Sequence, residues 1–270
     1  MGAGDASQFT RNRIDLGGLN VAYLNGGRGA PLVYLHGLSA SNRWESHHLA
    51  LAITNLVYAV QLPGWPEGSI PAVIESAHDY AKLIIALLDA LGLDSVDLVG
   101  HSFGGWIALD LAAEYPSRVS RLVLADAMGL DVPEAPAADL AAMDQDSFLR
   151  AAFVETGRVL VPGDFGGAIE DVRLGQEFET QWRSRELILG LTRGRLADPE
   201  LTAKLSSITA ETLVVWGRDD RLVPYQHGEL LARMIPHARL RLIDGAGHTP
   251  MRERRETFQR LVRDFLIGEG

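Results

Sequence analysis

The ten residues Val96-Asp97-Leu98-Val99-Gly100-His101-Ser102-Phe103-Gly104-Gly105 set the architecture that the rest of the chain follows. An apolar run from Val96 to Val99 leads into the pattern Gly-x-Ser-x-Gly, and a helical pattern follows it. This is the strand, tight turn and helix that the pattern requires. In such a turn the serine backbone is strained, and the small glycines let neighbouring chains approach. We therefore expect the hydroxyl of Ser102 to project over a sheet end, where helix N–H groups stabilise an oxyanion.

Short apolar runs on both sides of this turn predict further strands. They are rich in Val, Leu and Ile, which is typical of parallel strands that helices cover on both faces. Upstream, two β-prone stretches from about Arg13 to Leu24, broken by Gly17-Gly18, predict an antiparallel hairpin. The apolar runs are Leu32 to Leu35, Leu56 to Val60, Leu122 to Leu124, Leu213 to Trp216 and Leu240 to Ile243.

Amphipathic helical patterns fall between these runs. From about Ala77 to Leu91 apolar residues recur at spacings of three and four, and Ser76 with Asp79 makes a capping box. A second helix is expected from Ser102 to about Tyr115, and the last from about Pro250 to Leu266. The alternation of strands and helices predicts an α/β fold with a mostly parallel, doubly wound sheet of about eight strands.

The alternation stops between Gly129 and about Ser206, where the chain becomes acidic and helix-prone. We expect residues 129–206 to form a helical cap, inserted after the sixth strand. Residues 1–128 and 207–270 would then form the core that carries the sheet.

Composition excludes several classes of function. With 47% hydrophobic and 22% charged residues the chain should fold, and without cysteine it has no disulfides, no thiolate metal site and no cysteine nucleophile. A net charge of -10 disfavours nucleic acid, whose phosphates require a basic surface. The start of the chain lacks a secretory pattern and no apolar run approaches 18 residues, so we expect a cytoplasmic protein without a membrane span.

Candidate partners for Ser102 follow two later apolar runs. A serine hydroxyl needs a base that takes its proton, and the base needs an acceptor that fixes its tautomer. The pair Asp219-Asp220 follows one run, and His248 follows the next. Because parallel strands end at the same edge of a sheet, we expect these side chains to meet Ser102 there. A plain glycine-rich turn with an N-capping serine is the alternative, and it predicts no such partners.

The other histidines have weaker claims to catalysis. His36 ends a strand and is expected to anchor its loop by hydrogen bonds, and His101 is expected to point away from Ser102. The remaining ones lie on helical or polar stretches, which predicts solvated surface positions. They are His47-His48, His78, His227 and His237.

In their order, these motifs resemble the α/β-hydrolase superfamily over nearly the whole chain. The resemblance rests on His36-Gly37 at a strand end, the elbow at Ser102, the Gly-x-x-Asp turn and the Gly-His near the C-terminus. It implies the α/β-hydrolase fold and the chain order Ser, Asp, His for the triad. In this family the acid is usually the second of such a pair, before an apolar-Pro step, which implies Asp220. Asp126 holds the position where a minority of the family place the acid.

The resemblance also implies an oxyanion hole and a substrate pocket. The oxyanion hole would use the backbone N–H groups of Leu38 and Phe103, which follow His-Gly and the nucleophile. Large apolar residues are candidate pocket walls, with ordinary core packing as the alternative for each. These candidates are Trp44, Trp65, Phe153, Trp182 and Met251.

Three departures from the family's patterns bear on the shape of the pocket and on the expected activity. The loop Gln61 to Ser69 lacks the acid and the spacing that many relatives have after the fourth strand. The serine at the elbow disfavours haloalkane dehalogenases and epoxide hydrolases, which use aspartate there. Thr249 stands where the carbon-carbon bond hydrolases of aromatic degradation often have a tryptophan.

The leading hypothesis from the sequence is a serine hydrolase, carboxylesterase-like, that cleaves a small ester or lactone through an acyl-enzyme. The nearest alternative keeps the triad but cleaves a carbon-carbon bond in a vinylogous diketone, with Arg183 or Arg185 of the cap on the substrate's carboxylate or dienolate. A ligand receptor or signalling module that retained the fold is a further alternative, and so is a perhydrolase or cofactor-free oxygenase.

Cofactor motifs are missing from the sequence. It has no G-x-G-x-x-G after a strand, no P-loop lysine and no H-E-x-x-H, so we expect neither a cofactor nor a metal. The expected partner is a small-molecule substrate, and the oligomeric state stays open.

Overall fold

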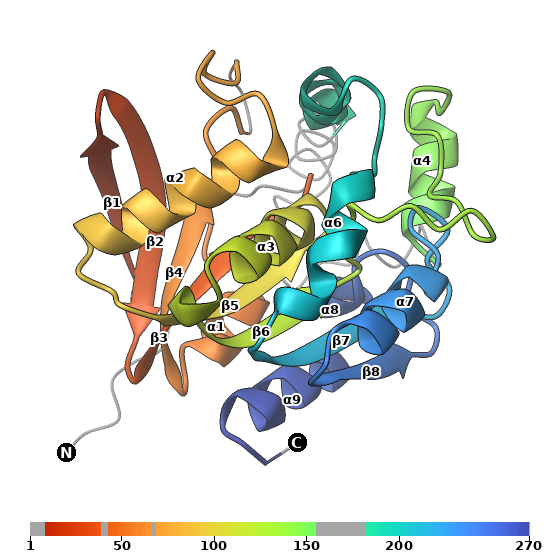
Figure 1. Ribbon diagram of the computed structural model, residues 1–270. Coiled ribbons are helices and arrows are strands. Elements are labelled where there is room, and N and C mark those ends of the chain that lie inside the picture. Colours follow the sequence, from red (N-terminus) through yellow and green to blue (C-terminus); the bar gives the residue numbers. More distant parts are fainter. Residues whose placement is uncertain (1–8, 39–42, 66–68, 155–181, 270) are drawn as a thin grey trace, which may run out of the picture.

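The computed structural model describes residues 9–38, 43–65, 69–154 and 182–269, which form an eight-stranded sheet with helices on both faces (Figure 1). Along the sheet the strand order is β1-β2-β4-β3-β5-β6-β7-β8. The hairpin partners β1 and β2 are antiparallel, β2 is antiparallel to β4, and all other neighbours are parallel. The strands are β1 (Phe9–Leu16), β2 (Leu19–Gly27), β3 (Ala30–Leu35), β4 (Asn55–Gln61), β5 (Val96–His101), β6 (Val119–Ala125), β7 (Glu211–Gly217) and β8 (Ala238–Ile243).

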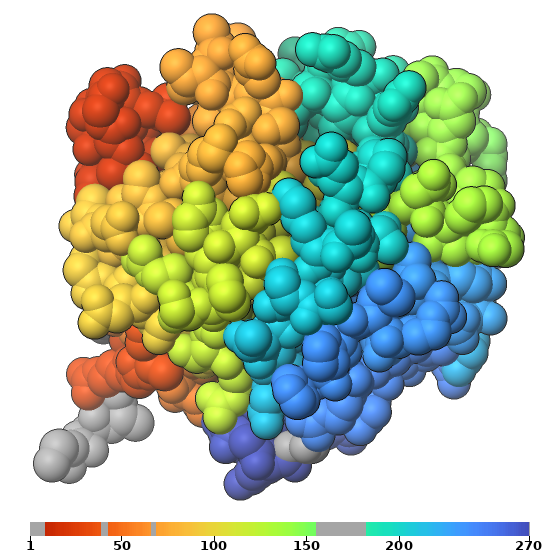
Figure 2. Space-filling view, viewed as in Figure 1, coloured from red at the N-terminus to blue at the C-terminus, as the bar shows by residue number. Residues whose placement is uncertain are grey.

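Helices α2, α3, α6 and α7 cover one face of the sheet, and α1, α8 and α9 lie against the other (Figure 1). Figure 2 shows the side chains of the first group as a continuous layer over the strands. Residues 182–192 are also helical. The helices are α1 (Ser46–Leu51), α2 (Ala77–Ala90), α3 (Phe103–Glu114), α4 (Gln145–Ala152), α6 (Pro199–Lys204), α7 (Gln226–Met234), α8 (Pro250–Glu253) and α9 (Arg255–Leu266), with 3-10 turns η1 (Pro116–Arg118) and η2 (Leu205–Ser207).

The central strands are buried on both faces because successive side chains point to opposite sides. In β3, Val33 and Leu35 join the apolar cluster under α2 and α3, whereas Leu32 and Tyr34 join the cluster under α1 and α9. The same division runs through β5, β6 and β7. This confirms the doubly wound α/β sheet that the apolar runs predict.

Two elements differ from the sequence prediction. The run Leu240 to Ile243 belongs to β8, an edge strand. From Ala238 to Leu242 its side chains alternate between half-buried and exposed and only Ile243 is buried, so the strand is not covered on both faces. The last helix is interrupted at Arg254, where φ is -132° and ψ is 51°. The carboxylate of Glu253 bonds to the N–H groups of Gly247 and Val154, so α8 is held by tertiary contacts as a single turn.

Three histidines expected at the surface are buried. His47 and His48 lie in α1, inside the apolar layer beneath the sheet, and their side chains pack on Tyr34. His227 is 1% exposed, and its Nε2 atom lies 2.8 Å from the carbonyl oxygen of Ala135. The sequence prediction was wrong here because a polar helical stretch does not reveal which neighbours cover it. His237 is exposed and His78 is half-buried.

The chain between β6 and β7 contains α4, the helical residues 182–192, α6 and η2. Part of the stretch expected to form a cap, residues 155–181, lies outside the described residues. The end of α4 reaches the carboxyl edge of the sheet, because the carbonyl oxygens of Ala151 and Ala152 accept the N–H groups of Arg221 and His248. Within the described part of the chain, no helix is both long enough and apolar enough to cross a membrane.

Candidate active site

The turn between β5 and α3 holds Ser102 in a strained backbone conformation. Its φ is 55°, in the left-handed region that costs free energy for a residue other than glycine. The turn is this tight because α3 begins against the end of β3: a Cβ atom on Gly104 would lie 2.2 Å from the carbonyl oxygen of Leu35. The N–H of Ser102 donates to the carbonyl oxygen of Ala125 at 2.9 Å, which ties the turn to β6.

Ser102, His248 and Asp220 form one hydrogen-bonded line. Nε2 of His248 lies 2.8 Å from Oγ of Ser102, and Nδ1 of His248 lies 2.7 Å from Oδ2 of Asp220. A carboxylate only accepts, so Nδ1 carries the proton and Nε2 is free to accept the serine proton. All three residues are buried, with exposed fractions of 5% or less. The arrangement can turn a serine hydroxyl into a nucleophile.

The structure separates the two adjacent aspartates. Both oxygens of Asp220 are bonded: Oδ2 takes the His248 proton, and Oδ1 accepts the N–H groups of Leu222 and Val223 at 2.8 and 3.0 Å. Asp219 is exposed and accepts the N–H of Gly245 at 3.0 Å. Asp220 therefore lies in the line with the imidazole, and Asp219 braces the turn.

Sequence reasoning missed the groups that hold the loop of His248. The N–H of His248 donates to the carbonyl oxygen of Ala152, and its own carbonyl accepts Nε2–H of His101 at 2.8 Å. Glu253 accepts the N–H of Gly247 at 2.8 Å. The role of Glu253 depends on the position of α8 beside the loop of His248, which no local sequence pattern predicts. As expected, His101 makes no hydrogen bond to Ser102 among the described contacts.

Among the described residues, one group of side chains could act as metal ligands. It consists of Asp126, Asp220 and His248, which each offer one atom within 4.8 Å of the others. Both ring nitrogens of His248 and both oxygens of Asp220 are already hydrogen-bonded. Oδ2 of Asp126 is the one such atom with no hydrogen-bond partner. A single available oxygen does not make a metal site, which normally needs three or four protein ligands.

The two backbone groups expected to bind an oxyanion are next to Ser102. Phe103 is the first residue of α3, so its N–H has no partner within the helix. Leu38 follows Gly37, on which a Cβ atom would lie 2.7 Å from Cβ of Ser102. The described backbone contacts include no acceptor for the N–H of Leu38.

The candidate pocket residues divide between the two faces of the sheet. Trp65 is buried and stacks on Phe103 at 5.7 Å, which brings it beside the serine turn. Phe153 caps α4 beside the loop of His248, and Trp182 packs on Phe148. On the opposite face, Trp44 stacks on Phe9 and Met251 belongs to the apolar cluster under α9.

The cap arginines are not equally placed. Arg185 donates from Nη1 to the carbonyl oxygens of Leu140 and Met143, and its guanidinium lies 3.8 Å above the Trp182 ring. This arginine is therefore engaged within the segment itself. Arg183 is exposed on the helical stretch 182–192.

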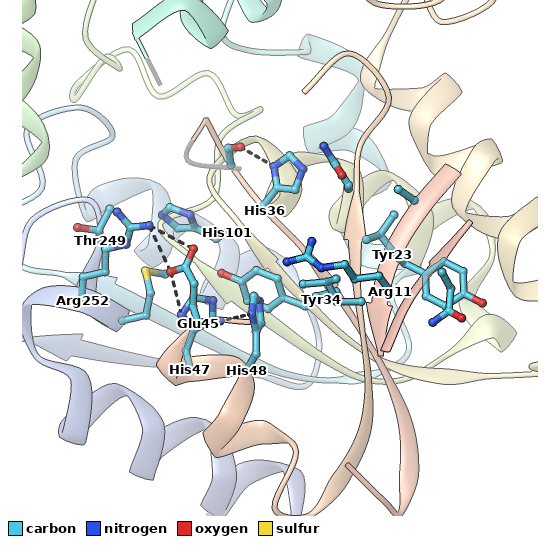
Figure 3. Close-up of a pocket in the computed structure, with 18 of the residues that line it drawn as sticks. Arg11, Tyr23, Tyr34, His36, Glu45, His47, His48, His101, Thr249 and Arg252 are labelled. Atoms are coloured by element: carbon cyan, nitrogen blue, oxygen red, sulfur yellow. Dashed lines mark hydrogen bonds and ion pairs between the residues drawn. The ribbon is translucent and has the colours of Figure 1, made fainter. Parts of the chain in front are cut away.

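A cavity of about 250 Å³ lies between β1, β2, β4 and α1 (Figure 3). His101 and Thr249 line it, whereas Ser102, Asp220 and His248 do not. Arg252 and Glu45 form an ion pair of 3.2 Å within it. Met251 also lines this cavity, which Ser102 does not reach.

The buried imidazoles around this cavity are held in the neutral form. Burial lowers the pKa of His36 and His47 to about 4 and that of His101 to about 3. As expected, His36 anchors its loop: Nδ1–H donates to the carbonyl oxygen of Gly37 at 2.7 Å, and Nε2 accepts the N–H of Leu62 at 3.1 Å.

Known proteins resemble this chain over most of its length. The model of the alpha/beta hydrolase family matches residues 32–260. A 2-hydroxy-6-oxo-6-phenylhexa-2,4-dienoate hydrolase of Comamonas testosteroni is 30% identical, covering 97% of each chain. A 2-hydroxymuconate semialdehyde hydrolase of Pseudomonas sp. (strain CF600) is 30% identical, covering 98% of this chain and 97% of the relative. A solved structure of an N-acyl homoserine lactone degrading enzyme has a TM-score of 0.73 at 28% identity, covering 94% of this chain and 100% of that chain.

Proposed function

This chain belongs to the alpha/beta hydrolase family, and on that basis we propose that Ser102, His248 and Asp220 are the catalytic triad of a serine hydrolase. Ser102 is the nucleophile, His248 moves the proton, and Asp220 orients and stabilises the imidazole. The observation that carries the proposal is the continuous line of contacts of 2.8 and 2.7 Å through the imidazole. The N–H groups of Leu38 and Phe103 hold the oxyanion.

For the substrate we propose a 2-hydroxy-6-oxo-dienoate, whose carbon-carbon bond is hydrolysed. The names of two 30%-identical relatives support this class over the ester or lactone that the sequence alone favours. A cap arginine, Arg183 or Arg185, is the cation we assign to the substrate's carboxylate.

The triad's chemistry fits this bond cleavage. The substrate first tautomerises, as the proton of its 2-hydroxyl moves to C5 and C2 becomes a carbonyl. His248 then takes the proton of Ser102 as Oγ attacks the 6-oxo carbonyl of this 2-keto tautomer, and the N–H groups of Leu38 and Phe103 hold the oxyanion. When the C5–C6 bond breaks, its electron pair passes along the conjugated chain to the oxygen on C2, which becomes a dienolate. The proton on His248 then neutralises this product. Water, deprotonated by His248, attacks the acyl-enzyme and releases the carboxylic acid and Ser102.

Residues 129–206 are proposed to act as the cap over this site. The support is the position of α4, whose last carbonyl oxygens bond to the loops that carry Asp220 and His248. Trp65, Phe153 and Trp182 are the pocket walls we retain, since they lie on the same face as Phe103 or on the cap segment.

The test is a direct comparison of substrates with the same enzyme. We expect 2-hydroxy-6-oxo-6-phenylhexa-2,4-dienoate and 2-hydroxymuconate semialdehyde to lose their yellow absorbance, with a kcat/KM above that of p-nitrophenyl acetate. The Ser102→Ala variant is the control for uncatalysed loss of colour. No acceleration with either dienoate would reject the proposed substrate class.

A lactone is the second candidate substrate, because an N-acyl homoserine lactone degrading enzyme shares 28% identity and the fold. The same triad would open a lactone ring, and Thr249 in place of the tryptophan common in carbon-carbon bond hydrolases leaves this reaction open. Acid released from N-acyl homoserine lactones, without any effect on the dienoates, would favour this candidate.

A further inference from the structure

Asp126 is a buried acid to which the proposed mechanism gives no role. It begins the loop after β6, and β6 lies between β5 and β7, so this loop lies between the turns of Ser102 and Asp220. Its exposed fraction is 0% and its φ is 45°. Burying an acid and straining its backbone both cost free energy, which is typical of positions where the surroundings or the function compensate.

The carboxyl group of Asp126 has one conventional hydrogen bond. Its Oδ1 accepts the N–H of Gly217 at 2.9 Å, and its Oδ2 is buried without a partner among the described contacts. An oxygen of Asp126 nevertheless lies within 4.8 Å of both a carboxylate oxygen of Asp220 and a ring nitrogen of His248. The incompletely bonded carboxyl is therefore next to the triad's acid.

Two carboxyl groups this close in a buried site do not both carry a charge. Asp220 receives three donors, from Leu222, Val223 and His248, whereas Asp126 receives one. The charge is therefore better stabilised on Asp220, and the proton belongs on Asp126.

The electrostatic surroundings of Asp126 act in the same direction. Burial, followed by repulsion from Asp220, raises the pKa of Asp126 well above its ordinary value. Repulsion from the carboxyl of Glu253 adds a smaller contribution to the raised pKa of Asp126, and burial raises the pKa of Glu253 itself.

We propose that Asp126 is a protonated positioning residue, which donates a hydrogen bond from its carboxyl O–H to the carboxylate of Asp220. This inference rests on the proposed function, because it assigns Asp126 a task within the same triad. The bond gives Asp220 a fourth donor, fixes the orientation of its carboxylate and draws charge away from it. The pair then presents a single negative charge to His248.

The proposal accounts for an acid in a left-handed backbone conformation. Asp and Asn tolerate this conformation best after glycine, and an Asn side-chain oxygen could still accept the N–H of Gly217. Asparagine has the same shape as a protonated aspartate, with an amide N–H₂ in place of the O–H, and it does not titrate. Glycine removes the donor and relieves the backbone strain.

The experiment compares Asp126→Asn and Asp126→Gly with the wild type, using p-nitrophenyl acetate as the substrate. Three quantities are measured: kcat, the acidic limb of the plot of kcat/KM against pH, and the melting temperature. We expect Asp126→Gly to lower kcat about tenfold to 100-fold, the worth of a hydrogen bond to a charged group. Its acidic limb should move to higher pH, because an Asp220 that lacks this donor favours protonated His248. Asp126→Asn should rescue both readouts. Asp97→Asn is the matched control, a buried acid on β5 bonded to Asn55, and should leave the limb unchanged.

Two outcomes would overturn the proposal. If Asp126 is ionised in the wild type, Asp126→Asn removes a negative charge beside His248 and moves the acidic limb to lower pH. If Asp126→Gly lowers only the melting temperature and leaves kcat and the limb in place, the residue is merely structural.

An infrared difference spectrum of wild type against Asp126→Asn tests the proton without any turnover. A carboxylic acid C=O band near neutral pH that disappears in the variant is the expected result, and its absence would overturn the proposal. Failure of the proposed function would instead appear as full activity of Ser102→Ala, with the infrared band still present.

Discussion

Oδ2 of Asp220 lies 2.7 Å from Nδ1 of His248, while the other oxygen of Asp220 is fixed by two backbone N–H groups. The carboxylate can therefore rotate little, and the imidazole is held with its proton on Nδ1. This places the acceptor nitrogen, Nε2, against Ser102.

Asp220→Asn should lower kcat by about 10⁴, because an amide N–H₂ facing Nδ1 favours the tautomer that cannot accept the serine proton. Asp219→Asn is the matched control, since Asp219 is exposed and its described side-chain hydrogen bond is to the N–H of Gly245. It should stay within a few-fold of wild type. Steady-state kinetics of both variants on one substrate measures the difference, and equal losses would contradict the assignment of Asp220.

Ser102→Ala should abolish covalent labelling by a fluorophosphonate and leave at best a rate about 10³ to 10⁴ above water, from binding and the oxyanion hole. The reason is that, among the described residues, Ser102 carries the hydroxyl that contacts Nε2 of His248. Mass spectrometry of the wild-type adduct should locate the label on Ser102. A label on another residue, or full labelling of the variant, would refute the nucleophile.

Gly104→Ala should destabilise the protein and lower activity together. A Cβ atom there would lie 2.2 Å from the carbonyl oxygen of Leu35, so α3 or the end of β3 must move, at a cost of about 1–3 kcal/mol or more. The displaced helix carries Ser102 and Phe103 with it. Urea unfolding and kcat measured on one preparation test this coupling.

Gly190→Ala is the control for that substitution. Gly190 is helical and nothing lies within 4 Å of the added Cβ, so this variant should gain about 0.5–1 kcal/mol of stability. Similar stabilities for the two alanine variants would show that α3 and β3 leave room for a Cβ atom at Gly104.

The sheet and the meeting of Ser102, His248 and Asp220 at its edge could be predicted from the sequence because their signals are local. The elbow at Ser102 is a contiguous pattern, and Asp220 and His248 each follow an apolar run, so parallel strands bring them together without further information. The choice of Asp220 over Asp219 came from the family's pattern, and the hydrogen bonds agree with it.

The remaining features depend on contacts between distant segments. His47 and His48 look polar in sequence, and only the packing of α1 under the sheet buries them. The break before α9 follows from the bonds of Glu253 to Gly247 and Val154, which no periodicity encodes. Asp126 was visible as a candidate acid, but its position beside Asp220 becomes clear only from the order of strands.

Acidification between pH 6.5 and about 4 should destabilise the protein through its buried histidines. The folded-state pKa of His36 is about 4, below the ordinary 6.5, so in this window the unfolded chain binds a proton that the folded chain refuses. Stability is therefore fully present above pH 6.5 and is lost as pH falls toward 4, by about 3 kcal/mol for a shift of this size. The hydrogen bonds agree with this direction. Nε2 of His36 accepts the N–H of Leu62, so a proton added to Nε2 would point at another donor.

His36→Gln removes the titrating group and retains a donor and an acceptor, so urea unfolding of this variant should depend less steeply on pH than the wild type in that window. His237→Gln, at an exposed histidine, is the matched control and should keep the wild-type slope. His47 and His101, whose pKa values burial lowers to about 4 and about 3, should still supply the remaining slope in both variants. If the free energy of unfolding depends on pH equally steeply in the wild type and in His36→Gln, then His36 takes up a proton in the fold as readily as in the unfolded chain. That result would contradict the prediction that its hydrogen bonds and burial keep it neutral.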